Sequence, residues 1–175
     1  MSVDIQAPGP EMIIFKGIFD FDELYKTMHD WFNFRGYTFH EVKFKKKSKD
    51  TGYEIELIWC PWRKVTDFLK YRFNVHVLIF NVEKIEVIKN NQKKELMKGR
   101  MFMEVKAFLE ADYSDRFEGS KLKKGIRQFI ISYVLKRKID TMWGDKLEFK
   151  QYEFLNVVKE CLDMQIKGNE HADVW

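Results

Sequence analysis

Apolar and polar residues alternate through the middle of the chain, over residues 53–109. In the first run Ile55, Leu57 and Trp59 are separated by glutamate and other residues, and in residues 69–79 every odd position is apolar. A period of two is typical of strands that cover a core on one face only. This block therefore predicts an antiparallel sheet.

Further strands are predicted around these two runs. They are residues 11–19, 37–44, 82–88 and 95–109. The last two are expected to form a hairpin across the polar turn at residues 89–93. Gly99 is expected to mark a bulge or a break between two short strands. Pro61 interrupts the strand that ends at Trp59, because proline cannot donate to a sheet ladder.

An amphipathic helix is predicted before the sheet, over residues 20–34. Asp20 followed by Glu23 has the form of a capping box, in which a carboxylate accepts a helix-start N–H. Gly36 is suited to a left-handed stop. Apolar residues recur between them at the helical period, at Phe21, Leu24, Tyr25, Met28 and Phe32.

Two apolar stripes follow the sheet. Ser120 is placed to cap a helix that reaches Ile139, and its stripe is Leu122, Ile126, Phe129, Ile130, Tyr133 and Val134. The second stripe, after Gly144, is Leu147, Phe154, Leu155, Val158 and Leu162. A glycine inside a helix costs only about 1 kcal/mol relative to alanine, so two helices or one bent helix fit equally well. We expect the first stripe to cover the sheet, and we expect a buried set of Leu57, Trp59, Phe73, Val75, Val77, Val105 and Phe129.

The predicted fold class is α+β. A curved antiparallel sheet of about six or seven strands packs on the N-terminal amphipathic helix and on one or two long C-terminal helices. Residues 11–164 form a single domain, long enough to bury a core without disulfides. Residues 1–10 are expected to be an irregular arm and residues 165–175 a tail.

This order of elements resembles the helix-grip arrangement of the START-like superfamily over roughly residues 11–139. The resemblance implies a curved sheet around a long terminal helix, often with a hydrophobic cavity between them. The chain would then carry or bind a hydrophobic small molecule. The aromatic side chains that could line such a cavity are Trp59, Tyr71, Phe73 and Phe129.

Charge adds one further candidate. The 31 Lys and Arg against 27 Asp and Glu leave a net charge of +4, too weak to imply a nucleic-acid partner. One dense basic run exists, at Lys43, Lys45, Lys46, Lys47 and Lys49. It could meet phosphates, which would make the chain a weak nucleic-acid-binding accessory protein. We favour the other interpretation, in which lysines protect an exposed sheet edge from aggregation.

No catalytic, metal or cofactor motif is present in the sequence. The histidines His29, His40, His76 and His171 lack metal-ligand spacing, and no glycine-rich phosphate loop occurs. Cys60 and Cys161 do not make a disulfide framework, which favours a reducing compartment. No segment has the length of a membrane span or the features of a signal peptide. We therefore expect an intracellular protein, or one assembled from subunits made there, and not an enzyme.

The leading interpretation is a non-enzymatic interaction or assembly subunit, for example of a virion, an appendage or a large complex. Trp62, Trp143 and Trp175 lie at breaks or at the terminus, where an aromatic ring is often half exposed and suited to a contact surface. Protein partners or a homo-oligomer are expected. The hydrophobic-ligand carrier and the nucleic-acid binder are the alternatives.

Overall fold

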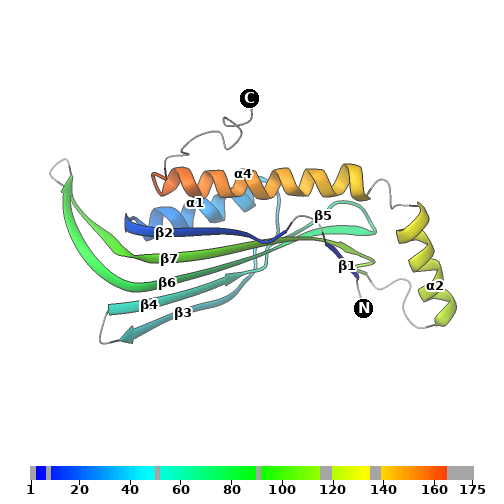
Figure 1. The fold of residues 1–175 in the computed structure, drawn as a ribbon, viewed down its shortest axis with the longest axis horizontal. Coiled ribbons are helices and arrows are strands. Elements are labelled where there is room, and N and C mark those ends of the chain that lie inside the picture. Colours follow the sequence, from blue (N-terminus) through cyan, green and yellow to red (C-terminus); the bar gives the residue numbers. More distant parts are fainter. Residues whose placement is uncertain are drawn as a thin grey trace, which may run out of the picture.

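The structure is a computed structural model that describes residues 3–6, 9–49, 52–89, 92–114, 120–134 and 139–164. It is an α+β fold, in which helices pack on an antiparallel sheet of seven strands (Figure 1). The strands are β1 (Val3–Gln6), β2 (Glu11–Phe19), β3 (Glu41–Lys49), β4 (Gly52–Trp59), β5 (Trp62–Lys64), β6 (Leu69–Lys89) and β7 (Gln92–Ala111). The helices are α1 (Phe21–Phe34), α2 (Lys121–Phe129), the π-helical turns η1 (Ile130–Val134) and η2 (Ile139–Gly144), and α4 (Asp145–Cys161). The predicted class is thus confirmed.

The long hairpin of β6 and β7 forms the centre of the sheet. The strand order is β1-β7-β6-β4-β3, with β2 also beside β7 and β5 also beside β6. Because β2 pairs with β7 alone and β3 with β4 alone, these two strands lie at opposite edges of the described sheet. The predicted irregular arm is wrong in part, since Val3–Gln6 pairs with the end of β7 as β1.

A bulge lies on β6, opposite Gly99. Asn81 and Val82 together face this glycine, because the β6–β7 register shifts between Phe80 and Glu83. Asn81 has a φ of 53°, and a Cβ on Gly99 would lie 3.1 Å from the carbonyl oxygen of Phe80. Close backbone approach therefore explains the glycine. The expected break in β7 is wrong: β7 is continuous, and the irregularity belongs to its partner.

Helices α1 and α4 lie side by side on one face of the sheet (Figure 1). Asp20 caps α1, and its Oδ1 accepts a hydrogen bond from the Glu23 N–H at 2.9 Å. The buried side of α1 consists of Phe21, Leu24, Met28, Trp31 and Phe32. Gly36 has a φ of 70° just after the helix, as the sequence predicts for a left-handed stop.

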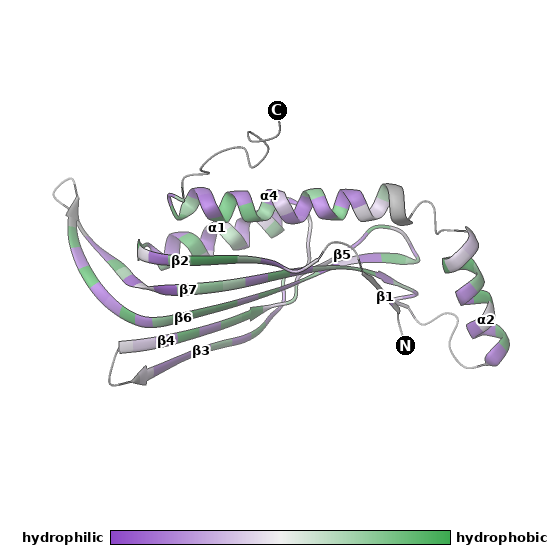
Figure 2. Cartoon of the chain, viewed as in Figure 1, coloured by the Kyte–Doolittle hydropathy of each residue, from purple (hydrophilic) through white to green (hydrophobic). Residues whose placement is uncertain are grey.

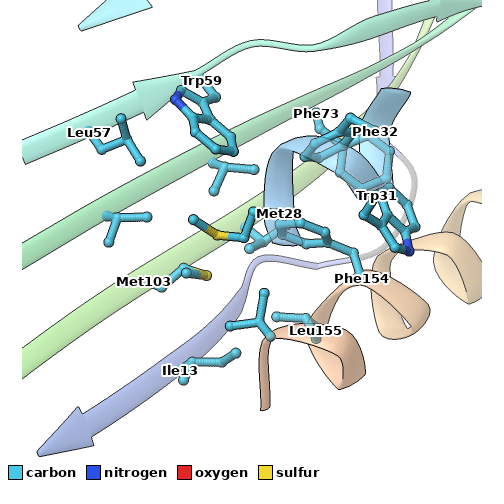
Figure 3. Close-up of a cluster of buried hydrophobic side chains, with 14 of the residues drawn as sticks. Ile13, Met28, Trp31, Phe32, Leu57, Trp59, Phe73, Met103, Phe154 and Leu155 are labelled. Atoms are coloured by element: carbon cyan, nitrogen blue, oxygen red, sulfur yellow. The ribbon is translucent and has the colours of Figure 1, made fainter. Parts of the chain in front are cut away.

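Aromatic and sulfur-containing side chains fill the space between these helices and the sheet. Figure 3 shows rings of α1 and α4 packed over the inward side chains of the strands. The Phe32 and Phe154 ring centroids are 4.9 Å apart, and those of Phe32 and Phe73 are 5.5 Å apart. Six of the seven predicted core residues are buried: Leu57, Trp59, Phe73, Val75, Val77 and Val105.

The prediction that the seventh residue, Phe129, is buried is wrong. Helix α2 stands at the end of the sheet instead of covering it (Figure 1), and Phe129 is 58% exposed. None of the α2 residues is buried. The side of the helix that meets the body carries Arg127 and, one turn later, the half-buried Ile131. At Gly144, where the sequence left two helices or one bent helix open, η2 passes into α4 without a break, because Gly144 has helical backbone angles of φ −64° and ψ −55°.

Candidate functional site

Helix α2 presents its apolar side to solvent. Leu122, Ile126, Phe129 and Tyr133 are 76%, 43%, 58% and 76% exposed. The first three lie on α2 and Tyr133 lies on η1, which continues it, and their spacing of four, three and four residues places them on one side of the helical segment. The Phe129 and Tyr133 rings stack with centroids 5.3 Å apart. We call these four residues the α2 stripe.

The opposite side of α2 is tied to the end of the sheet. Arg127 Nη1 lies 3.6 Å from Oδ2 of Asp112, a fully buried carboxylate with a φ of 55°. The Asp112 N–H donates to the Phe68 carbonyl oxygen at 2.8 Å. Ser120 caps the helix as predicted, accepting the Lys123 N–H at 3.2 Å. The outward orientation of the stripe is therefore set by polar contacts on the other side of the helix.

Positive charge flanks the α2 stripe. Lys121 and Lys123 precede and follow Leu122, about 100° to either side of it around the helix, and residues 120–134 contain no Asp or Glu. Figure 2 shows hydrophilic and hydrophobic bands alternating along α2. The surface is thus apolar in its centre and basic at its margins.

A second exposed apolar surface lies on α4 and is acidic. Phe149 is 74% exposed and Tyr152 is 44% exposed. The negative charge of Glu11 is the largest influence that raises the pKa of the Tyr152 hydroxyl, followed by burial and by Glu148. Asp145 lies one turn before Phe149, exposed to solvent. We call Phe149, Tyr152, Glu11, Asp145 and Glu148 the α4 patch.

The predicted basic run lies on the edge strand β3. Lys43 Nζ binds Glu56 Oε2 of β4 at 2.7 Å, and Lys46 Nζ lies 4.6 Å from the Tyr53 ring centroid. Lys45 and Lys47 are exposed, and the side chain of Lys49 lies outside the described set. This placement is the one at which lysines discourage pairing with another strand.

The predicted cavity-lining aromatics do not share one surface. Trp59 is fully buried, its Nε1 donates to Glu41 Oε2 at 3.0 Å, and its ring contacts Phe39 with centroids 4.7 Å apart. Phe73 packs among the rings of the core, whereas Phe129 is on α2. The positions that a carrier would use around Trp59 and Phe73 are occupied by the protein's own side chains.

The structure does bring Tyr71 and Trp143 together. The Tyr71 hydroxyl donates to the Trp143 carbonyl oxygen at 3.1 Å. Both residues line a hollow of about 280 Å³, and its other lining residues are Arg63, Lys64, Val65, Lys146 and Lys150. We call this hollow the cationic cleft. Its four cations have no common signal in the sequence, because β5 and α4 are far apart in the chain.

The two other tryptophans proposed for contact are placed differently. Trp62 is half-buried on β5, with Lys70 Nζ 5.5 Å from its ring centroid. Trp175 and the histidine His171 lie outside the described residues. A contact surface built on Trp62 and Trp143 would therefore use half-buried rings, whereas the α2 stripe is more exposed.

The described part of the chain has few side chains that are arranged for catalysis. Burial is the largest influence on both thiols and raises the pKa of Cys60 and of Cys161, which keeps them protonated at neutral pH. No group of three or more His, Cys, Asp or Glu within the described ranges could hold a metal ion. No helix among these residues has the length and apolar character to cross a bilayer. Comparisons with protein-family models, curated proteins and solved structures find no match to this chain.

Proposed function

We propose that this chain is a non-enzymatic assembly subunit that binds a neighbouring protein through the α2 stripe. The observation that carries the proposal is the direction of the helix: its apolar side faces solvent while Arg127 on the other side contacts buried Asp112. Large apolar side chains gathered on an exposed helix side are typical of a docking surface. Burial of these side chains against a partner would provide the driving force.

The charges around the stripe define the partner surface. Lys121 and Lys123 favour a partner that offers apolar side chains bordered by carboxylates. The α4 patch has this composition, with Phe149 and Tyr152 beside three carboxylates. The proposed neighbour is therefore a second copy of the chain.

Such a contact joins two different surfaces. The α2 stripe of one copy packs on the α4 patch of the next, so the first copy keeps its α4 patch free and the second keeps its α2 stripe free. A head-to-tail contact of this type builds a ring if the rotation closes and an open chain if it does not. The aromatic side chains Phe129, Tyr133, Phe149 and Tyr152 would form its centre, where most binding energy usually resides.

The stripe is tested by Leu122→Ser combined with Phe129→Ser. We expect wild-type protein to associate as concentration rises and the double variant to remain monomeric in sedimentation velocity. The unfolding midpoint of the monomer should change little, because exposed side chains contribute within about 0.5 kcal/mol. Phe34→Ser is the matched control, since Phe34 is 85% exposed on α1 and lies in neither surface. Wild-type protein that stays monomeric, or a double variant that assembles as wild type does, would contradict the proposal.

The two alternatives have less support. A carrier needs free space beside Trp59 and Phe73, and both are packed by neighbouring rings. A nucleic-acid binder would use the β3 lysines, but Lys43 is paired with Glu56, and the exposed Lys45, Lys46 and Lys47 form a short run that can neutralise few phosphates. Assembly through α2 would bury the side chains of the α2 stripe, which the described part of the chain leaves exposed to solvent.

A further inference from the structure

The cationic cleft lies where β5, the start of β6 and the beginning of α4 meet. Arg63 and Lys64 come from β5, Tyr71 from β6, and Lys146 and Lys150 from α4. Its lining therefore contains four cations and no carboxylate. The cations come from β5 and α4, two elements that are far apart in the sequence and adjacent in the fold.

Contacts with the surrounding protein position two of the cations at the cleft. Arg63 Nη1 donates to the Arg35 carbonyl oxygen at 2.7 Å, which fixes the guanidinium at the cleft. Lys146 Nζ lies 5.4 Å from the Trp143 ring centroid. Lys64 differs from these two, because it pairs with Lys70 and both ammonium groups lie 5.6 Å from the Tyr113 ring, on the sheet face opposite to Arg63 and Tyr71. The Trp143 ring holds the Lys146 ammonium group without neutralising its charge.

The fourth cation, Lys150, is half-buried among other charged groups. Burial lowers the pKa of Lys150, and the charge of nearby Arg63 lowers it further. Glu153 acts in the opposite direction, but this carboxylate forms an ion pair with Arg35. The Tyr71 hydroxyl is neutral, because burial raises its pKa to about 12. A bound anion would relieve the repulsion among the cations.

We propose that the cationic cleft binds a compact anion of the phosphate class that carries several charges, such as pyrophosphate or the phosphate chain of a nucleotide. Arginine offers forked donors that match phosphate oxygens, and lysines add point charges. A volume of about 280 Å³ suits a small anion and lies below the usual range for drug-sized ligands. Trp143 also lines the cleft, and its half-buried ring could stack with a base attached to the phosphates. This site is separate from the α2 stripe and does not depend on assembly.

Calorimetric titration of the full chain with orthophosphate, pyrophosphate, inorganic triphosphate and ATP at 0.15 M salt tests the site. We expect pyrophosphate to bind more tightly than orthophosphate, and Lys146→Gln combined with Lys150→Gln to weaken it by about tenfold or more, as charge-assisted hydrogen bonds are lost. Lys26→Gln combined with Lys159→Gln is the matched control, with the same change in net charge on α1 and α4 outside the cleft. This control should bind as wild type does.

The arms of the titration distinguish the source of the phosphates. Tighter binding of ATP than of inorganic triphosphate identifies a nucleotide, provided that ATP quenches tryptophan fluorescence, triphosphate does not, and Trp143→Phe removes the quenching. Equal binding of the two compounds identifies the phosphate chain alone. Because Lys150 must be protonated, affinity should fall as pH rises through its lowered pKa. The proposal is overturned if both double variants weaken binding equally. It is also overturned if only oligonucleotides bind, with affinity that depends on Lys45 and Lys47.

Discussion

Phe73→Ala is expected to lower the free energy of unfolding by about 3–5 kcal/mol. Phe73 is fully buried on β6, and its ring contacts those of Trp31, Phe32 and Tyr37 at centroid distances of 5.5 to 6.1 Å. Truncation leaves a cavity that rigid aromatic neighbours cannot fill. Urea denaturation, with equal slopes for the two proteins, measures the difference.

Phe129→Ala is the control for Phe73→Ala, because it removes the same side chain from an exposed position. Both are phenylalanines within apolar periodic segments, but Phe129 is 58% exposed. We expect its truncation to change the stability of the monomer by no more than about 0.5 kcal/mol. Similar losses for the two variants would mean that α2 packs on the core, in conflict with the described structure.

The second large effect is expected from charge reversal at the proposed contact. Lys121→Glu combined with Lys123→Glu should abolish association, because glutamates would then face the carboxylates Asp145 and Glu148 of the next copy. Like charges brought together at an interface cost several kcal/mol. Sedimentation velocity measures the loss.

Restoration provides the matched control. Asp145→Lys combined with Glu148→Lys, placed in the same chain as the two lysine reversals, should recover association. Reversal of Lys26 and Lys159 to Glu gives the same net charge and should leave assembly near the wild-type level. If association is not restored, the α4 patch is not the surface that the α2 stripe binds, and the stripe would have a different partner.

Local sequence signals were sufficient to predict the elements whose apolar side is the side that packs on the core. The Asp20 and Glu23 pair marked the start of α1, and alternation around Leu57 assigned the inward face of β4. These features depend on residues close in sequence, and the buried face follows directly from the apolar one.

The orientation of α2 could not be predicted in the same way. The apolar stripe through Phe129 was visible, and the usual reason for such a stripe is a core beneath it. In the structure Arg127 faces the body instead, because buried Asp112 lies at the end of β7. This pairing depends on a left-handed residue and on the tertiary fold, neither of which has a local signal here.

Two other features required the folded chain. Gly99 carried a signal for an irregular sheet, but only the register shows that the bulge is Asn81 and Val82 on β6. The cationic cleft joins Arg63 and Lys150, whose individual surroundings in the sequence are unremarkable mixtures of charged and apolar residues. Neither periodicity nor residue spacing can show that like charges so far apart in the sequence come together in the fold.

Mixing two complementary variants is the most direct test of assembly through α2. The first carries Leu122→Ser and Phe129→Ser and keeps the α4 patch, whereas the second carries Phe149→Ser and Tyr152→Ser and keeps the α2 stripe. Sedimentation velocity should find each variant monomeric alone and a heterodimer, with no larger species, in the equimolar mixture. A mixture that remains monomeric, or a second variant that assembles alone as wild type does, would contradict the head-to-tail contact.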